Sequence, residues 1–111
     1  MLRVTFYEDS RSRLSSFSAE GHASFADYGN DVVCAAASAI LQAARLGLEA
    51  YAGAEPEVAQ SSGRMRIFVA ESHRDGEGVQ AILTTAALSI EQIARQFPEN
   101  ITCARKSESK P

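Results

Sequence analysis

Residues Gly78–Pro98 form the most regular apolar pattern of the chain and read GVQAILTTAALSIEQIARQFP. The apolar residues recur at intervals of three and four and are Val79, Ile82, Leu83, Ala86, Ala87, Ile90, Ile93, Ala94 and Phe97. This spacing puts them on one face of a helix. The Gly-rich stretch Asp75–Gly78 opens the helix and Pro98 ends it. One apolar face requires a second layer to cover it.

A second helix is predicted upstream of the first. Asp31 belongs to the residue types that cap helix N-termini. The apolar stripe that follows it consists of Val33, Ala36, Ala37, Ile40, Leu41, Ala44, Leu48 and Tyr51. Gly53 and Pro56 end this helix. Between the preceding strand and Asp31, residues Ala23–Asn30 show no sustained period and are interpreted as a loop.

The N-terminal residues alternate between apolar and polar, which is typical of a β-hairpin. Leu2–Glu8 and Arg13–Gly21 are the two predicted strands, and Asp9–Ser12 is the turn between them. The apolar parity slips between Leu14 and Phe17, which indicates a β-bulge or a misplaced strand boundary there.

Three further segments complete the predicted order of elements. Glu57–Gln60 and Arg64–Glu71 form a second hairpin around the turn Ser61-Ser62-Gly63. Ile101–Ala104 is a short last strand, and the polar residues 106–111 form a C-terminal tail. The order ββαββα followed by a short strand predicts a two-layer α+β fold. We expect a mostly antiparallel sheet of four to five strands with two helices on one face, as one domain over residues 1–105.

The composition favours a small soluble protein that forms an oligomer. The chain has 111 residues and a net charge of −3, with 19 alanines but only 24 residues of the types Leu, Ile, Val and Phe. These 24 residues are about 22% of the chain, slightly above the roughly 20% below which chains tend to stay disordered. A chain of this length leaves much surface exposed, so we expect a second copy to cover part of it.

Charge and hydropathy exclude several classes of function. No apolar run approaches the roughly 20 residues of a membrane span, and the alternating N-terminus is not a signal peptide, which predicts a cytoplasmic protein. The basic residues are scattered in a mildly acidic chain, so we expect no direct nucleic-acid binding.

No cofactor or metal is expected either. Gly76–Ala81 matches a dinucleotide-binding pattern, but the strand before it ends too early for the tight turn that such a site needs. Cys34 and Cys103 form no CxxC pair and no disulfide framework. His73 is interpreted as a solvated loop histidine and Cys103 as a small apolar strand residue.

Cys34 is the candidate nucleophile. As the third residue after Asp31 it is predicted in the first turn of its helix, where backbone N–H groups stabilise a thiolate and offer an oxyanion hole. His22, twelve residues upstream at the end of a strand, is the candidate general base. Spacing alone favours the plainer interpretation, in which Cys34 is a small packing residue among alanines and His22 bonds locally.

The residues around this pair are more specific than the pair itself. They read Gly21-His22-Ala23, then after a short loop Gly29-Asn30-Asp31, then Val32-Val33-Cys34-Ala35-Ala36-Ala37-Ser38. This resembles the ribosomal-processing cysteine protease family, Prp, whose pattern is Gly-His-Ala, a variable loop, Gly-x-Asp, two β-branched aliphatics, Cys-Ala and a nearby Ser. The resemblance covers about 18 positions. Ala37 stands where a larger aliphatic residue, often Val, is usual, which predicts a changed packing volume with the same mechanism.

The resemblance implies a cytoplasmic endopeptidase without a cofactor. In this family the enzyme removes the N-terminal extension from the precursor of large-subunit ribosomal protein twenty-seven, after a segment with paired aromatics and a small residue. Cys34 is then the nucleophile and His22 its base, and the protein is a homodimer.

Four further residues are candidates for supporting roles. Asp31 caps the helix or orients the imidazolium of His22, or both. Ser38 lies one turn after Cys34, where it positions the thiol or returns a hydrogen bond to the Cys34 carbonyl. Gly21 belongs to the motif, and Gly29 can hinge the loop.

Two aromatic residues of the same loop are candidates for substrate binding. Phe25 and Tyr28 can cover an aromatic side chain of the substrate, or anchor the loop by simple packing.

Two other classes of function stay open from the residues alone. The first is a non-catalytic, ribosome-associated binding module, in which Cys34 would be alkylated slowly. The second is a thiol acyltransferase or hydrolase that acts on a small molecule. A metal site made of His22, Asp31 and Cys34 has less support from the sequence than the protease or these two classes.

Overall fold

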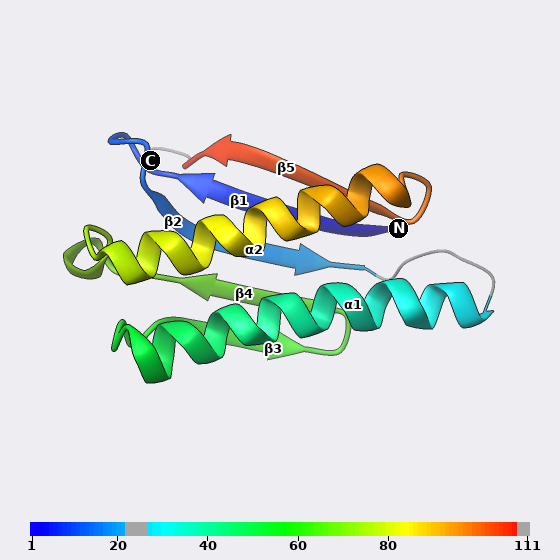
Figure 1. Ribbon diagram of the computed structural model, residues 1–111, viewed down its shortest axis with the longest axis horizontal. Coiled ribbons are helices and arrows are strands. Elements are labelled where there is room, and N and C mark those ends of the chain that lie inside the picture. The colour runs from blue at the N-terminus through cyan, green and yellow to red at the C-terminus, as the bar shows by residue number, and fades with distance from the viewer. Residues whose placement is uncertain (22–26, 109–111) are drawn as a thin grey trace.

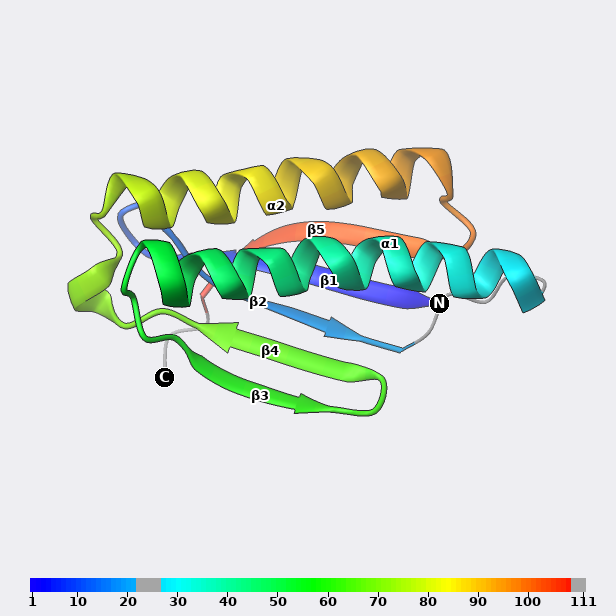
Figure 2. The ribbon, with the colours of Figure 1, turned by 60° about the horizontal axis from the view of Figure 1, so that its bottom comes forward.

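The computed structural model is built on a five-stranded sheet that carries both long helices on one face (Figures 1 and 2). It describes residues 1–21 and 27–108, with residues 27–31 described by their backbone only. The strands are β1 (Leu2–Glu8), β2 (Leu14–Glu20), β3 (Glu57–Ser61), β4 (Arg64–Phe68) and β5 (Ile101–Ser107). The helices are α1 (Asp27–Leu46), continued by the π-helical turn η1 (Gly47–Tyr51), the 3-10 turn η2 (Glu71–His73) and α2 (Glu77–Gln96).

The strand order of the sheet is β3-β4-β2-β1-β5. Every neighbouring pair is antiparallel except β1 and β5, which run parallel. The predicted α+β class, the mostly antiparallel sheet and the two helices on one face are therefore confirmed. The parallel pairing arises because α2 carries the chain back along the sheet between β4 and β5 (Figure 1).

Alternation along the strands separates a core face from an outer face. In β1, Leu2, Val4 and Phe6 are buried against the helices, while the intervening residues lie on the other face. Phe6 pairs with Phe17 of β2, and their ring centroids are 5.4 Å apart. Each large side chain buried in this way contributes roughly 1.5–3 kcal/mol.

The two helices bury most of the faces that their periodicity predicts, but Ala36 and Tyr51 of the predicted stripe are exposed. The buried residues of α2 are Val79, Leu83, Ala86, Ala87 and Ile90. Those of α1 and η1 are Val33, Ala37, Leu41, Ala44 and Leu48. The alanines of both faces let helix and sheet approach closely but bury little area each.

The predicted β-bulge lies at Ser15. Tyr7 pairs with Ser16 but Glu8 pairs with Leu14, so Ser15 is the extra residue. Its side chain is fully buried, and its hydroxyl donates to the carbonyl oxygen of Tyr7 at 3.3 Å. The hydroxyl also contacts the carboxylate of Glu108. The extra polar residue is therefore satisfied inside the domain.

The prediction for the start of α1 was wrong. The helix begins at Asp27, four residues before Asp31, so residues 27–30 belong to the helix and not to a loop. The first turns of α1 extend past the end of the sheet, where no apolar stripe is needed (Figure 1). Apolar periodicity therefore gave no signal for them, although each added residue still gains a backbone hydrogen bond.

The prediction for the end of β5 was also too short. The strand continues past Ala104 to Ser107, and Lys106 and Ser107 pair with Tyr7 and Glu8 of β1. The backbone N–H of Glu108 also donates to the carbonyl oxygen of Glu8 at 2.8 Å. Side chains with charge interrupt the apolar pattern, but the backbone ladder does not depend on them.

Helix α1 is more apolar than the sequence expectation allowed. By length and composition the segment Val32–Tyr51, with a mean hydropathy of 1.4, is long enough to span a membrane. The expectation that no run approaches such a span therefore does not hold for this helix. Its inner face packs on the sheet as a core helix, and alanines supply much of its remaining apolar character.

The dinucleotide pattern at Gly76–Ala81 lies where the sequence predicted. β4 ends at Phe68, and η2 stands between this strand and the start of α2. The tight strand-to-helix turn that brings a pyrophosphate to a helix N-terminus is thus replaced by a longer connection.

Candidate active site

Cys34 faces a cavity between α1 and the β3–β4 hairpin. Its side chain is half-buried and packs against the core. The cavity, which we call the Cys34 cavity, has a volume of about 240 Å³. It is lined by Leu2, Ala19, Cys34, Ala37, Ser38, Leu41, Gln42, Gln60, Ser61, Gly63, Arg64 and Met65.

One wall of the Cys34 cavity is a single face of α1. The lining residues of this helix are separated by three, four, seven and eight positions, which is the spacing of one helical face. Ser38 lies one turn after Cys34 on that face, as predicted, and its side chain is exposed. Leu41 and Ala37 are buried and make the inner part of this wall apolar.

The opposite wall is the distal end of the β3–β4 hairpin. Met65 is buried under the cavity, and its sulfur lies 3.9 Å from the side-chain nitrogen of Gln42 on α1. Arg64 stands at the rim with its side chain 70% exposed, and it donates to Glu20 at 3.0 Å. The cavity therefore has an apolar interior and a polar rim, as ligand-binding pockets commonly have.

The turn of this hairpin also holds the end of β2. The backbone N–H of Gly21 donates to the carbonyl oxygen of Gly63 at 2.9 Å. Gly21 has φ of +94°, and a Cβ atom on it would lie 2.4 Å from the carbonyl oxygen of Met1. Only glycine fits this position. Gly21, the last described residue before His22, therefore lies beside the turn that borders the Cys34 cavity.

The position of Cys34 within its helix differs from the prediction. Since α1 begins at Asp27, Cys34 is the eighth helical residue, and Asp31 is the fifth and not the N-cap. Backbone N–H groups are unpaired only in the first turn, and the effect of the helix dipole fades beyond it. The helix N-terminus therefore does not supply the oxyanion hole or the activation that the sequence suggested for Cys34.

Several predicted site residues are placed only in part. His22 and Phe25 lie outside the described residues. Tyr28, Gly29 and Asp31 are in α1, and their side chains lie outside the description. Gly29 is consequently a helical residue in this structure and not a loop hinge, because the helix extends through it.

The second cysteine has a different environment. Cys103 is half-buried in β5 and packs against the core, as predicted. Its thiol has a raised pKa of about 11. Burial is the main cause, the nearby carboxylate of Glu91 adds to it, and Arg105 opposes it more weakly. Cys103 is thus a protonated thiol at neutral pH.

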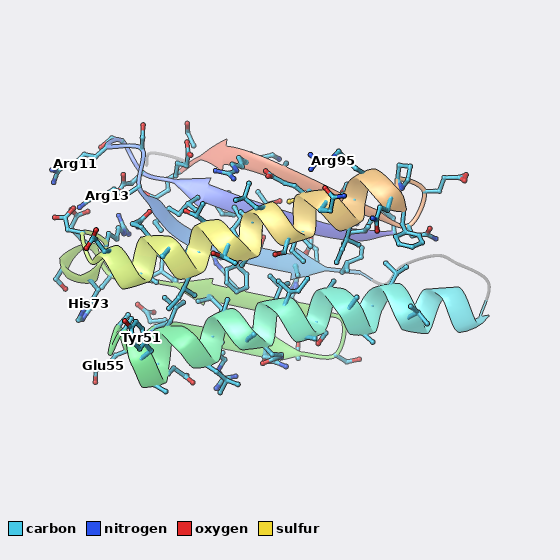
Figure 3. The ribbon with its side chains drawn as sticks, viewed as in Figure 1. Arg11, Arg13, Tyr51, Glu55, His73 and Arg95 are labelled. Atoms are coloured by element: carbon cyan, nitrogen blue, oxygen red, sulfur yellow. The ribbon has the colours of Figure 1, made fainter. Side chains whose placement is uncertain are left out.

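The described residues place neither His73 nor a metal site at Cys34. His73 lies in η2, near the start of α2 and away from the N-terminal end of α1 (Figure 3). Over residues 1–21 and 27–108, no group of three His, Cys, Asp or Glu side chains is arranged to hold a metal ion.

Sequence reasoning found one wall of the site and missed the other. Nothing in the alternation of residues 57–68 distinguishes Gln60, Arg64 and Met65 from other strand residues. The only signal was the Ser-Gly turn, which predicts a hairpin but not what the hairpin covers.

Comparison with known proteins shows which family most of the chain matches. The profile of the family described as Cysteine protease Prp matches residues 1–102. The ribosomal processing cysteine protease Prp of Staphylococcus aureus is 25% identical over 101 residues, covering 91% of this chain and 95% of the relative. The corresponding Bacillus subtilis protein is 29% identical over 106 residues, covering 91% and 94%.

Solved structures agree with the sequence comparison. The crystal structure of an essential ribosomal processing protease Prp from S. aureus, with a covalently linked product peptide, superposes with a TM-score of 0.86 at 26% identity. It covers 96% of this chain and 100% of the solved chain. The same S. aureus protease with a substrate peptide gives a TM-score of 0.84 at 26% identity, with the same coverage. The chain described here therefore belongs to the cysteine protease Prp family of ribosomal-processing enzymes and is itself a cysteine protease.

Proposed function

We propose that this protease removes the N-terminal extension from the precursor of large-subunit ribosomal protein twenty-seven, with Cys34 as nucleophile and His22 as general base. The relatives named above are ribosomal processing proteases, and the S. aureus enzyme binds a substrate peptide. The residues from Gly21 to Ser38 resemble the family's pattern, apart from Ala37. The substrate is thus an extended segment of a ribosomal protein precursor.

The observation that carries the proposal is the convergence of two chain segments at the Cys34 cavity. Cys34 enters it from α1, and the hydrogen bond between Gly21 and Gly63 brings the end of β2 to its border. The residue after Gly21 is His22. The meeting of Cys34 with the strand end that precedes His22 supports a cysteine–histidine pair, which is the first requirement of thiol nucleophilic catalysis.

The reaction follows from these two groups. The imidazole of His22 takes the proton of the Cys34 thiol, and the thiolate sulfur bonds to the scissile carbonyl carbon. The imidazolium gives the proton to the departing amine, which breaks the peptide C–N bond and leaves a thioester on Cys34. A water molecule, deprotonated by His22, then attacks the thioester, and the acid product leaves as the thiol is regenerated.

Asp31 and Ser38 are proposed as supporting residues. Asp31, now inside α1 and not at its cap, is the remaining candidate to orient His22. Ser38 lines the Cys34 cavity, from which its hydroxyl can contact the thiol or the substrate. Phe25 and Tyr28 are proposed to contact an aromatic side chain of the substrate.

We also propose a cytoplasmic homodimer that uses no cofactor and binds neither nucleic acid nor a membrane. Several large apolar side chains are exposed on α1, η1 and α2, and they offer a surface for a second copy. They are Val32, Leu46, Tyr51 and Leu88, with exposed fractions of 56–82%. Sedimentation velocity measures the mass in solution, and a monomer at the concentration of the assay would contradict the homodimer.

The test of the proposed activity is cleavage of a peptide that spans the aromatic processing segment. Mass spectrometry should find two products with the native protein and none with Cys34→Ala or His22→Ala. Cys103→Ala is the matched control, because it removes the other thiol and should leave cleavage intact. Normal cleavage by Cys34→Ala would refute the proposal.

The same assay separates the proposed protease from the two alternatives. A non-catalytic binding module would bind the peptide without cleaving it and would show slow alkylation of Cys34. An acyltransferase or hydrolase for small molecules would form a covalent adduct on Cys34 from a thioester but not from the peptide.

A further inference from the structure

The outer edge of β3 lies next to the Cys34 cavity and has no strand beside it among the described residues. β3 is the last strand in the sheet order, below α1 in Figure 2. Two of its residues, Gln60 and Ser61, also line the Cys34 cavity. We propose that the substrate peptide binds as an additional strand along the outer edge of β3 and so leads its scissile bond to Cys34. This inference rests on the proposed function.

The hydrogen-bond parity of the sheet shows which backbone groups point outward. The N–H of Val69 donates to the carbonyl of Ser15 on β2 at 2.8 Å, so Met65 and Ile67, at even spacing from Val69, also bond toward β2. The alternate residues Arg64 and Arg66 therefore bond toward β3, where they pair with Ser61 and Ala59. The backbone N–H and C=O groups of the other residues of β3, Val58 and Gln60, are thus directed away from the sheet.

Beyond its first residue, Glu57, the edge of β3 carries few of the features that keep edge strands from pairing. Val58, Ala59 and Gln60 carry no charge, and Pro56 precedes the strand. The opposite edge strand, β5, carries the adjacent charged residues Arg105 and Lys106. Charged side chains and prolines within an edge strand discourage the addition of another strand. β3 is therefore the edge that is open to an extended peptide.

The length of the Cys34 cavity suits an extended peptide. Its wall on α1 runs from Cys34 to Gln42, eight residues apart, which spans about 12 Å at 1.5 Å per residue. At roughly 3.3 Å per residue, three to four residues of an extended peptide cover that distance. A peptide paired with Val58 and Gln60 thus passes Ser38 and reaches Cys34 just beyond the end of the hairpin.

The interior of the cavity can receive one large apolar side chain of that peptide. Its volume of about 240 Å³ exceeds the roughly 150 Å³ of an apolar cavity that accommodates benzene. Leu2, Ala37 and Leu41 make its interior apolar. In an added strand every second side chain points to the same face, so one residue enters the cavity while its neighbours face away.

The first test is a scan of the peptide by N-methylation. Each variant carries one methylated backbone amide, and its Kd for the Cys34→Ala protein is measured by fluorescence anisotropy, so that binding is read without cleavage. Strand addition predicts that Kd rises by about tenfold at every second amide and changes less than about twofold at the amides between them. A uniform or irregular effect along the peptide would overturn the inference.

The second test changes the edge itself. Gln60→Pro removes the outward N–H without removing a bond to β4, so peptide binding should weaken about tenfold while the thermal midpoint changes little. Gln60→Ala, which keeps the N–H, should bind nearly normally. Ser107→Pro on β5 is the matched control, because the N–H of Glu108 bonds inward to Glu8 and that of Ser107 therefore points outward.

The outcomes distinguish this inference from the proposed function. If the native protein cleaves the peptide but the scan shows no alternation and Gln60→Pro binds normally, the protease assignment stands and strand addition is refuted. If Gln60→Pro does not fold, the scan on the Cys34→Ala protein decides alone. A peptide that neither binds nor is cleaved would refute both.

Discussion

The backbone N–H of Gly21 donates a 2.9 Å hydrogen bond to the carbonyl oxygen of Gly63. These two glycines are 42 positions apart, and both have positive φ angles, +94° and +71°. Gly63 is in the turn that borders the Cys34 cavity, and Gly21 precedes His22. This single bond therefore couples the hairpin wall of the site to the segment that carries the proposed base.

The conformation of Gly21 predicts a large effect of a small substitution. Gly21→Ala should lower the free energy of unfolding by roughly 2–4 kcal/mol, because it adds strain at positive φ and forces the carbonyl of Met1 to move. Urea unfolding measures the change. Gly53→Ala is the control, since φ there is +61° but a Cβ meets nothing within 4 Å. Equal losses for the two variants would contradict the close approach at Met1.

The lining of the Cys34 cavity predicts that Ala37→Val changes the packing volume and keeps the activity. Ala37 is buried, 1% exposed, and lines the cavity. Because a larger aliphatic residue, often Val, is usual here in the family, the two added methyl groups should change kcat/KM by less than about threefold for a peptide with a large aromatic side chain near the scissile bond. Ala36→Val on the exposed side of the same helix is the control. A loss of about tenfold with Ala37→Val alone would show that this side chain competes with the substrate for the cavity.

The buried ion cluster around Asp9 predicts a loss of stability in acid. Its side chain is 5% exposed and pairs with Arg13 at 2.9 Å and Arg74 at 3.2 Å. Burial raises the pKa of Asp9, but backbone N–H groups of Arg13 and Arg11 and the two guanidinium groups outweigh it and hold it at about 2, below the ordinary 3.8. Because the folded pKa is the lower one, the stabilisation is present above pH 4 and disappears between about pH 4 and 2.

Asp9→Asn tests this cluster directly. It should lower the free energy of unfolding by about 2–4 kcal/mol at pH 7, since it leaves the buried guanidinium of Arg74 and the partly buried one of Arg13 with less compensation. Its thermal midpoint should fall less steeply than that of the native protein between pH 4 and 2. Asp75→Asn, whose side chain pairs with Arg13 but is 73% exposed, should change stability by less than about 1 kcal/mol. A steep acid transition in Asp9→Asn would assign the effect to other carboxylates.

The two cysteines should differ in their reactivity. Burial and Glu91 raise the pKa of Cys103 to about 11, so only about one part in a thousand is thiolate at pH 8. Iodoacetamide at pH 8 should therefore add one label, on Cys34, long before a second. Peptide mapping identifies the labelled residue, and Cys34→Ala should remove the fast reaction. Faster labelling of Cys103 would contradict this assignment.

Local periodicity predicted most of the fold. The intervals in Gly78–Pro98 and in the stripe from Val33 to Tyr51 identified both helices, and the two-residue alternation identified both hairpins. Even the bulge at Ser15 followed from a slip in parity. These features depend on which face of each element is buried, and the order of apolar and polar residues along the element determines that face.

The boundaries of elements were predicted wrongly where the backbone conformation does not depend on the burial of side chains. The first turns of α1 lie beyond the sheet, and the end of β5 carries charged side chains, yet helix and ladder hydrogen bonds continue through both. The start of α1 mattered most for the site. It moved Cys34 from the first helical turn to the third, which removed the dipole argument for its activation.

The motif around Cys34 was visible in the sequence because its residues are close together in the chain. The rest of the site was not, because Leu2, Ala19, Cys34 and Met65 come from four separate elements. Their meeting depends on strand order, on the register of β2 against β4 and on the Gly21–Gly63 hydrogen bond. Periodicity predicts whether a side chain points to the core or to the surface. Long-range packing and backbone pairing determine which other residues it contacts.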